Sequence, residues 1–140
     1  MTTRTFALVF GIVFLLVGIA GFIPGITTEH THPDVTVTAG LGLVFGLFPV
    51  NVLHNLAHLV YGVWGLVASR SPVGARTYAW GVFIGYALLT LMGLIPAMRL
   101  HTTFGLVPLY GHDIWLHALL AAVAAYFVFA RNREPSPATP

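Results

Sequence analysis

Long stretches without a formally charged residue alternate with short polar segments along the chain. One covers residues 5–23 and is closed by Pro24, and another covers residues 77–95 and is closed by Pro96. A helix of about 20 residues crosses a hydrocarbon layer about 30 Å thick. The pattern predicts a transmembrane helix in each. An alternative interpretation of residues 5–23 is a cleaved signal peptide, because residues 18–20 (GIA) fit a small-x-small cleavage site.

Residues 35–69 form a longer uncharged stretch that one straight helix cannot accommodate. At about 1.5 Å per residue such a helix would be about 52 Å long, which exceeds the thickness of a bilayer. Pro49 is the expected break, because proline suits the first turn of a helix. We therefore predict a second span over residues 49–69, preceded by a short re-entrant or interfacial segment over residues 35–48.

The fourth span is predicted over residues 114–130, with Asp113 as its N-cap. Residues 25–34 and 97–112 are expected to be loops. The fold class that follows is an all-α transmembrane four-helix bundle, a single domain over residues 1–131. The proline-containing tail at residues 132–140 is predicted to be disordered and cytoplasmic.

The arginines give an orientation for this bundle. All six basic residues are arginine, and five of them flank spans on one predicted side, whereas Arg99 lies on the other. Positive residues are enriched on the cytoplasmic side of membrane proteins. Both termini are therefore predicted to be cytoplasmic, with the protein in the cell inner membrane. The five arginines on the predicted cytoplasmic side are Arg4, Arg70, Arg76, Arg131 and Arg133.

Composition agrees with a lipid environment. The chain is 57% hydrophobic and 7% charged, whereas soluble domains have about 25% charged residues. The arginines are scattered, so nothing indicates nucleic-acid binding. Cysteine is absent, which excludes disulfides and thiolate chemistry. The expected partner is the bilayer, with a homo-oligomer or a larger membrane complex as further alternatives.

Short similar segments in the two halves of the chain indicate an internal repeat. The same elements recur in the same order in the two halves, which favours two parallel helical hairpins, the first with extra loop. The repeat is inferred from three pairs of similar segments: residues 21–24 (GFIP) and 93–96 (GLIP), residues 45–49 (FGLFP) and 104–108 (FGLVP), and residues 52–54 (VLH) and 115–117 (WLH).

Polar residues recur with helical spacing inside two of the spans. Four of them form one stripe on the second span, and two lie on one face of the fourth span. Polar side chains of a membrane helix face protein rather than lipid, so we expect a buried polar cluster in the outer half of the bundle. Its members are Asn51, His54, Asn55, His58, Asp113 and His117.

Three functions fit this cluster. His54, His58, His117 and Asp113 offer the nitrogen and oxygen ligands of a transition-metal site, and opposed histidines can also ligate haem. In the structural alternative, the polar groups only hold the helices together, and small residues such as Gly11 and Gly81 serve close packing or docking on a larger complex. The third function is a small proton or ion conductor. No motif for nucleophilic or phosphate chemistry occurs, so a non-enzymatic role is favoured.

The remaining histidines lie in the predicted loops. His30, His32, His101 and His112 are expected to be solvated, and the alternative is a flexible surface that collects metal ions.

Residues 48–66 (FPVNVLHNLAHLVYGVWGL) and 111–117 (GHDIWLH) resemble a family of small bacterial membrane proteins that is described only as a domain of unknown function. The resemblance covers nearly the whole chain except the tail after Arg131. It implies four spans and a bacterial inner membrane, and it brings no activity, cofactor or catalytic residue.

Overall fold

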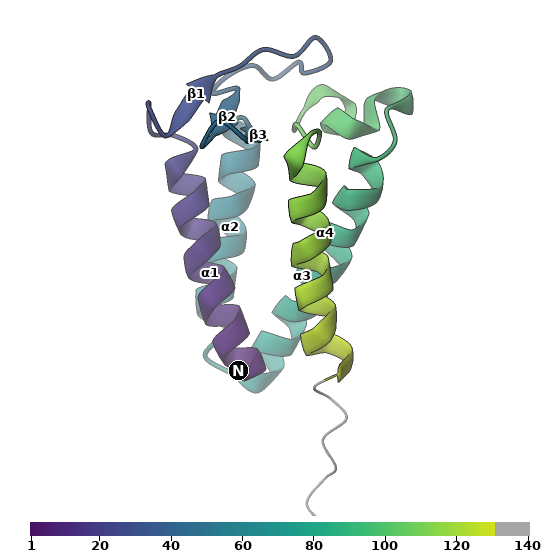
Figure 1. The fold of residues 1–140 in the computed structure, drawn as a ribbon. Helices are drawn as coiled ribbons and strands as arrows, with labels where there is room; N and C mark the ends of the chain where they lie inside the picture. Colours follow the sequence, from purple (N-terminus) through teal and green to yellow (C-terminus); the bar gives the residue numbers. More distant parts are fainter. Residues whose placement is uncertain (131–140) are drawn as a thin grey trace, which may run out of the picture.

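The fold is that of a computed structural model, which describes residues 1–130, and its main elements are four antiparallel α-helices (Figure 1). The four helices lie where the apolar stretches predicted them, although their bounds differ by a few residues. The predicted tail at residues 132–140, with Arg131 and Arg133, lies outside the described residues. The helices are α1 (Thr3–Ala20), α2 (Val52–Ala68), α3 (Pro72–Gly93) and α4 (His112–Ala125), which a five-residue π-helical segment, η2 (Tyr126–Ala130), continues.

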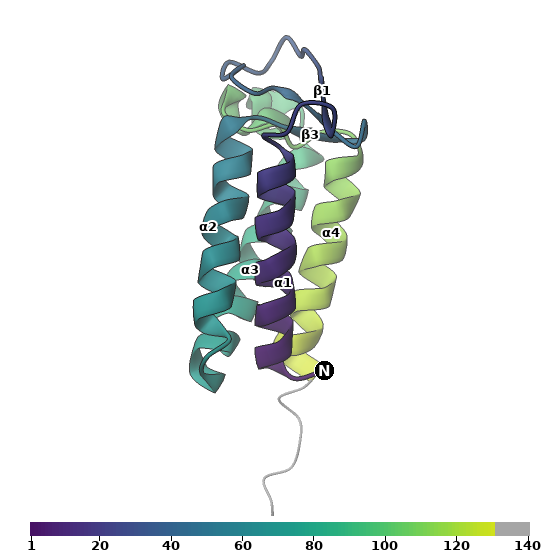
Figure 2. The same ribbon diagram turned by 90° about the vertical axis from the view of Figure 1, so that its left-hand side faces the viewer.

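The helices form two hairpins that lie side by side. Helix α1 packs mainly on α2, and α3 packs mainly on α4. The N-terminus, the α2–α3 turn and the end of η2 share one end of the bundle, here called the turn end (Figures 1 and 2). The other connections lie at the opposite end, here called the cap end. At the turn end the Arg4 Nε donates to the Ser69 carbonyl at 2.8 Å, which joins the first hairpin across its open end.

The arginines of the described residues follow the predicted asymmetry. Arg4 lies at the start of α1, Arg70 follows α2 and Arg76 lies in the first turns of α3, so all three are at the turn end. Arg99 lies at the cap end, in the 3-10 helical segment η1 (Ala97–Gly105).

Glycines allow the helices to approach closely. A Cβ at Gly11 of α1 would lie 2.8 Å from the backbone nitrogen of Leu66, and one at Gly65 of α2 would lie 2.7 Å from the Gly11 Cα. A Cβ at Gly81 of α3 would lie 2.3 Å from the Trp64 ring. These contacts are too short for any side chain, so the small residues are used inside the bundle.

A small antiparallel sheet corrects the all-α prediction. Its order is β1-β2-β3, and it covers the cap end of α1 and α2. Residues 35–48, predicted to be a re-entrant or interfacial segment, contain β2 and the start of β3, and their position relative to a membrane stays a prediction. The strands are β1 (Thr27–Glu29), β2 (Gly42–Val44) and β3 (Phe48–Val50).

The second helix also begins later than predicted. Pro49 lies in β3, paired with Leu43, rather than in the first turn of a helix. The N-cap of α2 is Asn51, whose side-chain oxygen accepts from the His54 N–H at 3.0 Å. A side chain that satisfies a free N–H of the first turn fixes where the helix starts, and Pro49 does not offer one.

Two turns at the cap end share one unusual conformation. Turns 44–47 and 103–106 each place a Phe-Gly pair in the left-handed region, with φ of 53° and 70° in the first and 60° and 92° in the second. In both, the N–H of the last residue donates to the carbonyl of the first, at 3.0 and 3.2 Å. Pro49 and Pro108, which follow the two turns at the same interval, are both fully buried. This shared geometry supports the predicted repeat of two hairpins.

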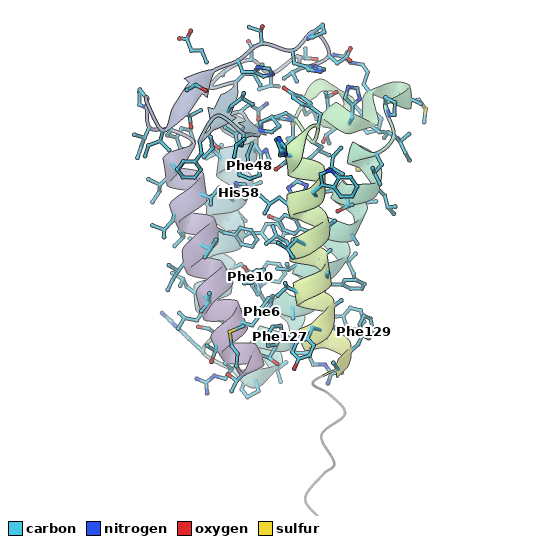
Figure 3. All side chains as sticks on the ribbon, viewed as in Figure 1. Phe6, Phe10, Phe48, His58, Phe127 and Phe129 are labelled. Carbon is cyan, nitrogen blue, oxygen red and sulfur yellow. The ribbon has the colours of Figure 1, made fainter. Side chains whose placement is uncertain are left out.

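The interior is aromatic toward the turn end and polar toward the cap end. Figure 3 shows His58 in the half nearer the cap end and Phe6, Phe10 and Phe127 in the other half. Phe6 is fully buried, and its ring stacks on Phe127 with centroids 4.6 Å apart. The predicted placement of the polar residues in one half of the bundle agrees with this arrangement.

The outward faces of the four helices are apolar. Large apolar side chains are more than half exposed on each helix, for example Leu16 of α1, Val60 of α2, Leu91 of α3 and Leu119 of α4. Two helical segments, Thr3–Ala20 and His112–Ala130, are long and apolar enough to cross a membrane, and Val52–Ala68 is a shorter apolar helix.

Candidate metal centre

Three ligand-bearing side chains converge between α2 and α4. His54, Asp113 and His117 each offer one nitrogen or oxygen atom, and these atoms all lie within 4.8 Å of one another. All three residues are buried, with 4%, 2% and 1% of their surfaces exposed. Two imidazoles and a carboxylate form a common ligand set for zinc and other first-row transition metals. The group could therefore hold a metal ion.

The spacing within this group fits a shared ion better than a direct hydrogen bond. The His117 Nε2 and the Asp113 Oδ2 are 3.4 Å apart, and this oxygen has no hydrogen-bond partner. Nitrogen and oxygen atoms joined by a hydrogen bond are usually about 2.9–3.0 Å apart. Two ligands of a tetrahedral zinc ion, each about 2.0–2.1 Å from the metal, are about 3.3–3.4 Å apart.

Several polar atoms around the group have no hydrogen-bond partner among residues 1–130. They are buried, and an unpaired buried polar atom costs about 1–3 kcal/mol. Native proteins rarely leave such atoms unpaired unless a bound ion, water or a functional role explains them. The six atoms are His54 Nδ1, Asn55 Nδ2, Asn55 Oδ1, His58 Nδ1, Asp113 Oδ2 and His117 Nδ1.

Local structure positions the ligands on the two helices. His54 is the third residue after the Asn51 N-cap, and its N–H donates to the Asn51 side chain, so its place in the first turn of α2 is fixed. Asp113 was predicted to be the N-cap of the fourth helix, and this is wrong: the N-cap is Gly111, with φ of 67°, and no side chain caps the helix. Asp113 instead lies in the first turn, where it reaches His117 one turn later.

Two other members of the predicted polar cluster are buried beside the group. The ring of His58 lies 4.6 Å from that of His54, centroid to centroid, and stacks on Phe14 of α1. Asn55 faces α1, where a Cβ at Gly21 would lie 2.0 Å from its side-chain oxygen. Neither belongs to the group within 4.8 Å, so the assignment of His58 as a ligand stays a prediction.

Asn51, the remaining member, is a structural residue. It is fully buried, and its amide nitrogen donates to the Val37 carbonyl at 2.9 Å and to the Leu106 carbonyl at 2.7 Å. One side chain thereby joins α2 to the cap-end segments of both hairpins. Asn51 therefore holds the cap-end segments in place over His54, Asp113 and His117.

Sequence reasoning missed an aromatic wall of the group. Tyr86 of α3 is buried, and its ring meets His117 edge-on with centroids 4.9 Å apart. The opposite neighbour of Tyr86 is Phe14, stacked at 5.4 Å. The signal that could have indicated this was the position of Tyr86 in the middle of an apolar span, where a hydroxyl needs a protein environment.

The loop histidines were predicted to be solvated, and this holds only for His112, which is exposed. His30, His32 and His101 are partly buried at the cap end. The His32 ring stacks on Tyr110 with centroids 4.2 Å apart. Burial lowers the pKa of His32 below its ordinary value and raises the pKa of Tyr110 to about 12. This direction favours the uncharged form of the His32 imidazole at neutral pH.

Comparison with known proteins gives a family and no activity. No curated protein and no solved structure matches the chain. The family described as a domain of unknown function (DUF4383) matches residues 4–130. Because this match covers nearly the whole chain, the protein belongs to the DUF4383 family.

Proposed function

We propose that the protein is a four-span membrane protein of the bacterial inner membrane that binds a divalent transition-metal ion through His54, Asp113 and His117. The observation that carries the proposal is the convergence of three buried ligand atoms within 4.8 Å, with a carboxylate oxygen that lacks a hydrogen-bond partner. Uncompensated burial of such groups is costly, and a bound cation offsets that cost.

The apolar exterior supports the membrane part of the proposal. Soluble proteins rarely expose contiguous apolar patches larger than a few hundred Å², whereas every helix here has large apolar side chains on its outer face. The three arginines at the turn end, with one at the cap end, favour a cytoplasmic turn end.

The number of converging ligands favours an ion over haem. A haem iron uses four positions for the porphyrin and accepts protein ligands only from its two faces. Here a carboxylate lies 3.4 Å from one of the two imidazoles, in the space that a macrocycle would need. A small ion can bind all three groups at once.

One observation no longer supports the alternative function, docking on a larger membrane complex. That interpretation depended on the small-residue faces, and the structure uses them internally, with Gly11 against Gly65 and Gly81 against Trp64.

Zinc binding tests the metal proposal. The full chain, purified in detergent and stripped with EDTA, is dialysed against Zn²⁺, and the bound metal is measured by mass spectrometry. His117→Gln is expected to lose one equivalent of zinc relative to the wild type, because a neutral amide is a poor zinc ligand. His112→Gln, the same change at an exposed position of the same helix, is expected to lose none.

The absence of any difference between His117→Gln and the wild type in bound zinc would contradict the proposal. If the purified wild type had an absorption band of bound haem and His117→Gln lacked it, the ligand of this site would be haem and not a metal ion.

Single cysteines test the four-span topology. The chain has no native cysteine, so Ser71→Cys in the α2–α3 turn and Thr38→Cys at the cap end each introduce one reactive thiol. Both residues are exposed. In intact cells whose outer membrane has been permeabilised, a membrane-impermeant maleimide is expected to label Thr38→Cys and to label Ser71→Cys only after lysis.

Equal labelling of both thiols before lysis would show that the two ends of the bundle share one side of the membrane, and the topology would be wrong.

A further inference from the structure

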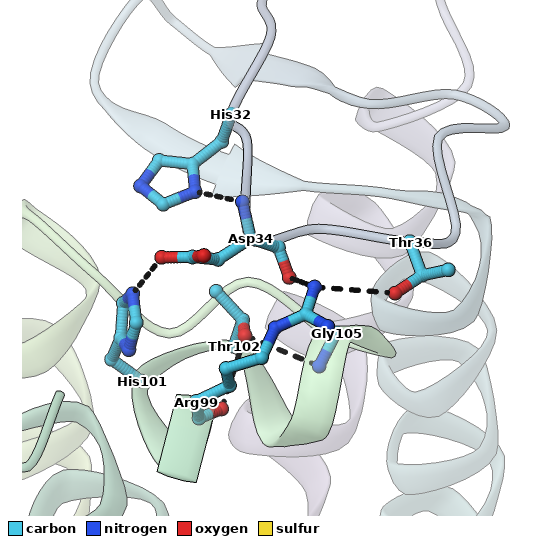
Figure 4. Close-up of polar contacts among 7 residues, drawn as sticks. All are labelled: His32, Asp34, Thr36, Arg99, His101, Thr102 and Gly105. Carbon is cyan, nitrogen blue, oxygen red and sulfur yellow. Dashed lines mark hydrogen bonds and ion pairs between the residues drawn. The ribbon is translucent and has the colours of Figure 1, made fainter. Parts of the chain in front are cut away.

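A second group of metal-ligand side chains lies at the cap end, outside the helices that hold the first. His32 and Asp34 come from the segment between β1 and β2, and His101 comes from η1 (Figure 4). One ligand atom from each lies within 4.8 Å of the others. All three residues are partly buried, and the side chains of His101 and Asp34 are 15% and 45% exposed, so the group is open to solvent.

The distances within this group repeat those of the buried group. The His101 Nε2 and the Asp34 Oδ2 are 3.3 Å apart, which is again the separation of two ligands on a tetrahedral zinc ion, about 3.3–3.4 Å. The Nδ1 of His101 is buried and has no hydrogen-bond partner. Among the described residues, Asp34 is therefore the partner of the Nε2 of this imidazole, and its Nδ1 has none.

Backbone and side-chain hydrogen bonds hold the two ligand-bearing segments together. The Arg99 guanidinium donates to the Asp34 carbonyl and to the Thr36 hydroxyl (Figure 4). The N–H groups of Thr36 and Val37 donate to the Gly105 carbonyl at 2.8 and 3.1 Å. These bonds fix Asp34 opposite His101 before any ion binds, which lowers the entropy cost of forming a site.

His32 is held more weakly. Its Nδ1 accepts from the Asp34 N–H at 3.2 Å, which is at the long end of the usual range for a hydrogen bond. In the neutral imidazole the lone pair that binds a metal is then at Nδ1. Metal binding exchanges this one long hydrogen bond for a metal–nitrogen bond.

We propose that His32, Asp34 and His101 form a second, solvent-accessible binding site for a divalent transition-metal ion such as Zn²⁺, which joins the β1–β2 segment to η1. The site is independent of the proposed buried centre, because the two share no ligand. An ion bound there connects the caps of the two hairpins through its ligands and restrains residues 32–37 against η1.

Zinc stoichiometry and hydrogen exchange test the site in the full chain in detergent. Asp34→Asn and His101→Gln are each expected to lose one equivalent of Zn²⁺, whereas the exposed control His112→Gln loses none. The double variant His101→Gln/His117→Gln is expected to bind no zinc. Zn²⁺ is also expected to slow amide exchange in residues 30–40 of the wild type and of His117→Gln, but not of His101→Gln. Circular dichroism checks that each variant is folded.

The outcomes separate the two sites. If Asp34→Asn and His101→Gln keep the wild-type stoichiometry and the protection of residues 30–40, the outer site is overturned, whatever His117→Gln does. If His101→Gln loses its equivalent while His117→Gln loses none, the outer site stands and the buried centre fails.

Discussion

Replacing Asp113 with asparagine is expected to abolish tight zinc binding at the buried centre without destabilising the metal-free protein. The loss of an outer-shell partner alone weakens metal binding by about 10–100-fold, and Asp113→Asn removes a ligand, so the affinity is expected to fall by more than about 100-fold. The stabilisation of about 2.7 kcal/mol that zinc bound at this centre gives at 100 times its Kd disappears with it, whereas the stabilisation by zinc at the outer site is unchanged.

The metal-free Asp113→Asn variant is expected to be at least as stable as the metal-free wild type, because the cost of burying the carboxylate is larger than the stabilisation that the helix dipole gives it. Asp113 lies in the first turn of α4, where the helix dipole favours a carboxylate by about 0.3–1 kcal/mol. Its side chain is only 3% exposed, and burying a carboxylate costs several kcal/mol. The neutral amide removes the larger of these two contributions.

Thermal unfolding with and without Zn²⁺ measures both effects. If the cluster only holds the helices together, Asp113→Asn lowers the stability of the metal-free protein and leaves its zinc response unchanged. That pair of results would contradict the metal centre and support the structural interpretation.

Asn51→Asp is expected to cause the largest loss of stability. The substitution keeps the oxygen that caps α2, but it removes the amide that donates to the Val37 and Leu106 carbonyls. Each buried carbonyl left unpaired costs about 1–3 kcal/mol, and the new carboxylate lies beside both. Two such carbonyls predict a loss of about 2–6 kcal/mol in the free energy of unfolding.

Ser71→Ala is the matched control, because it removes an exposed N-cap that has one hydrogen bond, to the Gly74 N–H at 3.0 Å. Loss of such a cap costs about 1 kcal/mol. Denaturation in detergent, followed by tryptophan fluorescence, compares the two variants. If the free energy of unfolding fell no more in Asn51→Asp than in Ser71→Ala, Asn51 would not be needed to join the cap-end segments of the two hairpins.

The helices could be predicted because their signal is local. An uncharged stretch of about 20 residues between prolines or arginines is enough to indicate a helix, and each of the four observed helices overlaps one of these stretches. The small sheet could not be predicted in the same way. Each strand has three residues, and β1 pairs with residues 13 positions or more along the chain, so no period of alternation was long enough to detect.

The candidate site was predicted where helical spacing determines it. His54, Asp113 and His117 were assigned from their positions on two helices, and the structure brings them together. The N-cap role of Asp113 was wrong because Gly111 can adopt the positive φ at which this helix starts. For the outer group, only a general alternative was predicted, a metal-collecting surface that included His32 and His101. Its convergence with Asp34 was not predicted, because it depends on Arg99 and Gly105 docking on a segment about 65 residues earlier.

The proposed function depends on two imidazoles and a carboxylate that hold one metal ion inside the bundle. X-ray absorption fine structure measures the ligands of zinc bound to the full-length Asp34→Asn variant, in which the outer site is disabled. We expect nitrogen and oxygen ligands at about 2.0–2.1 Å with the outer-shell scattering of two imidazoles. A shell of water oxygens without imidazole scattering, or no retained zinc, would contradict it.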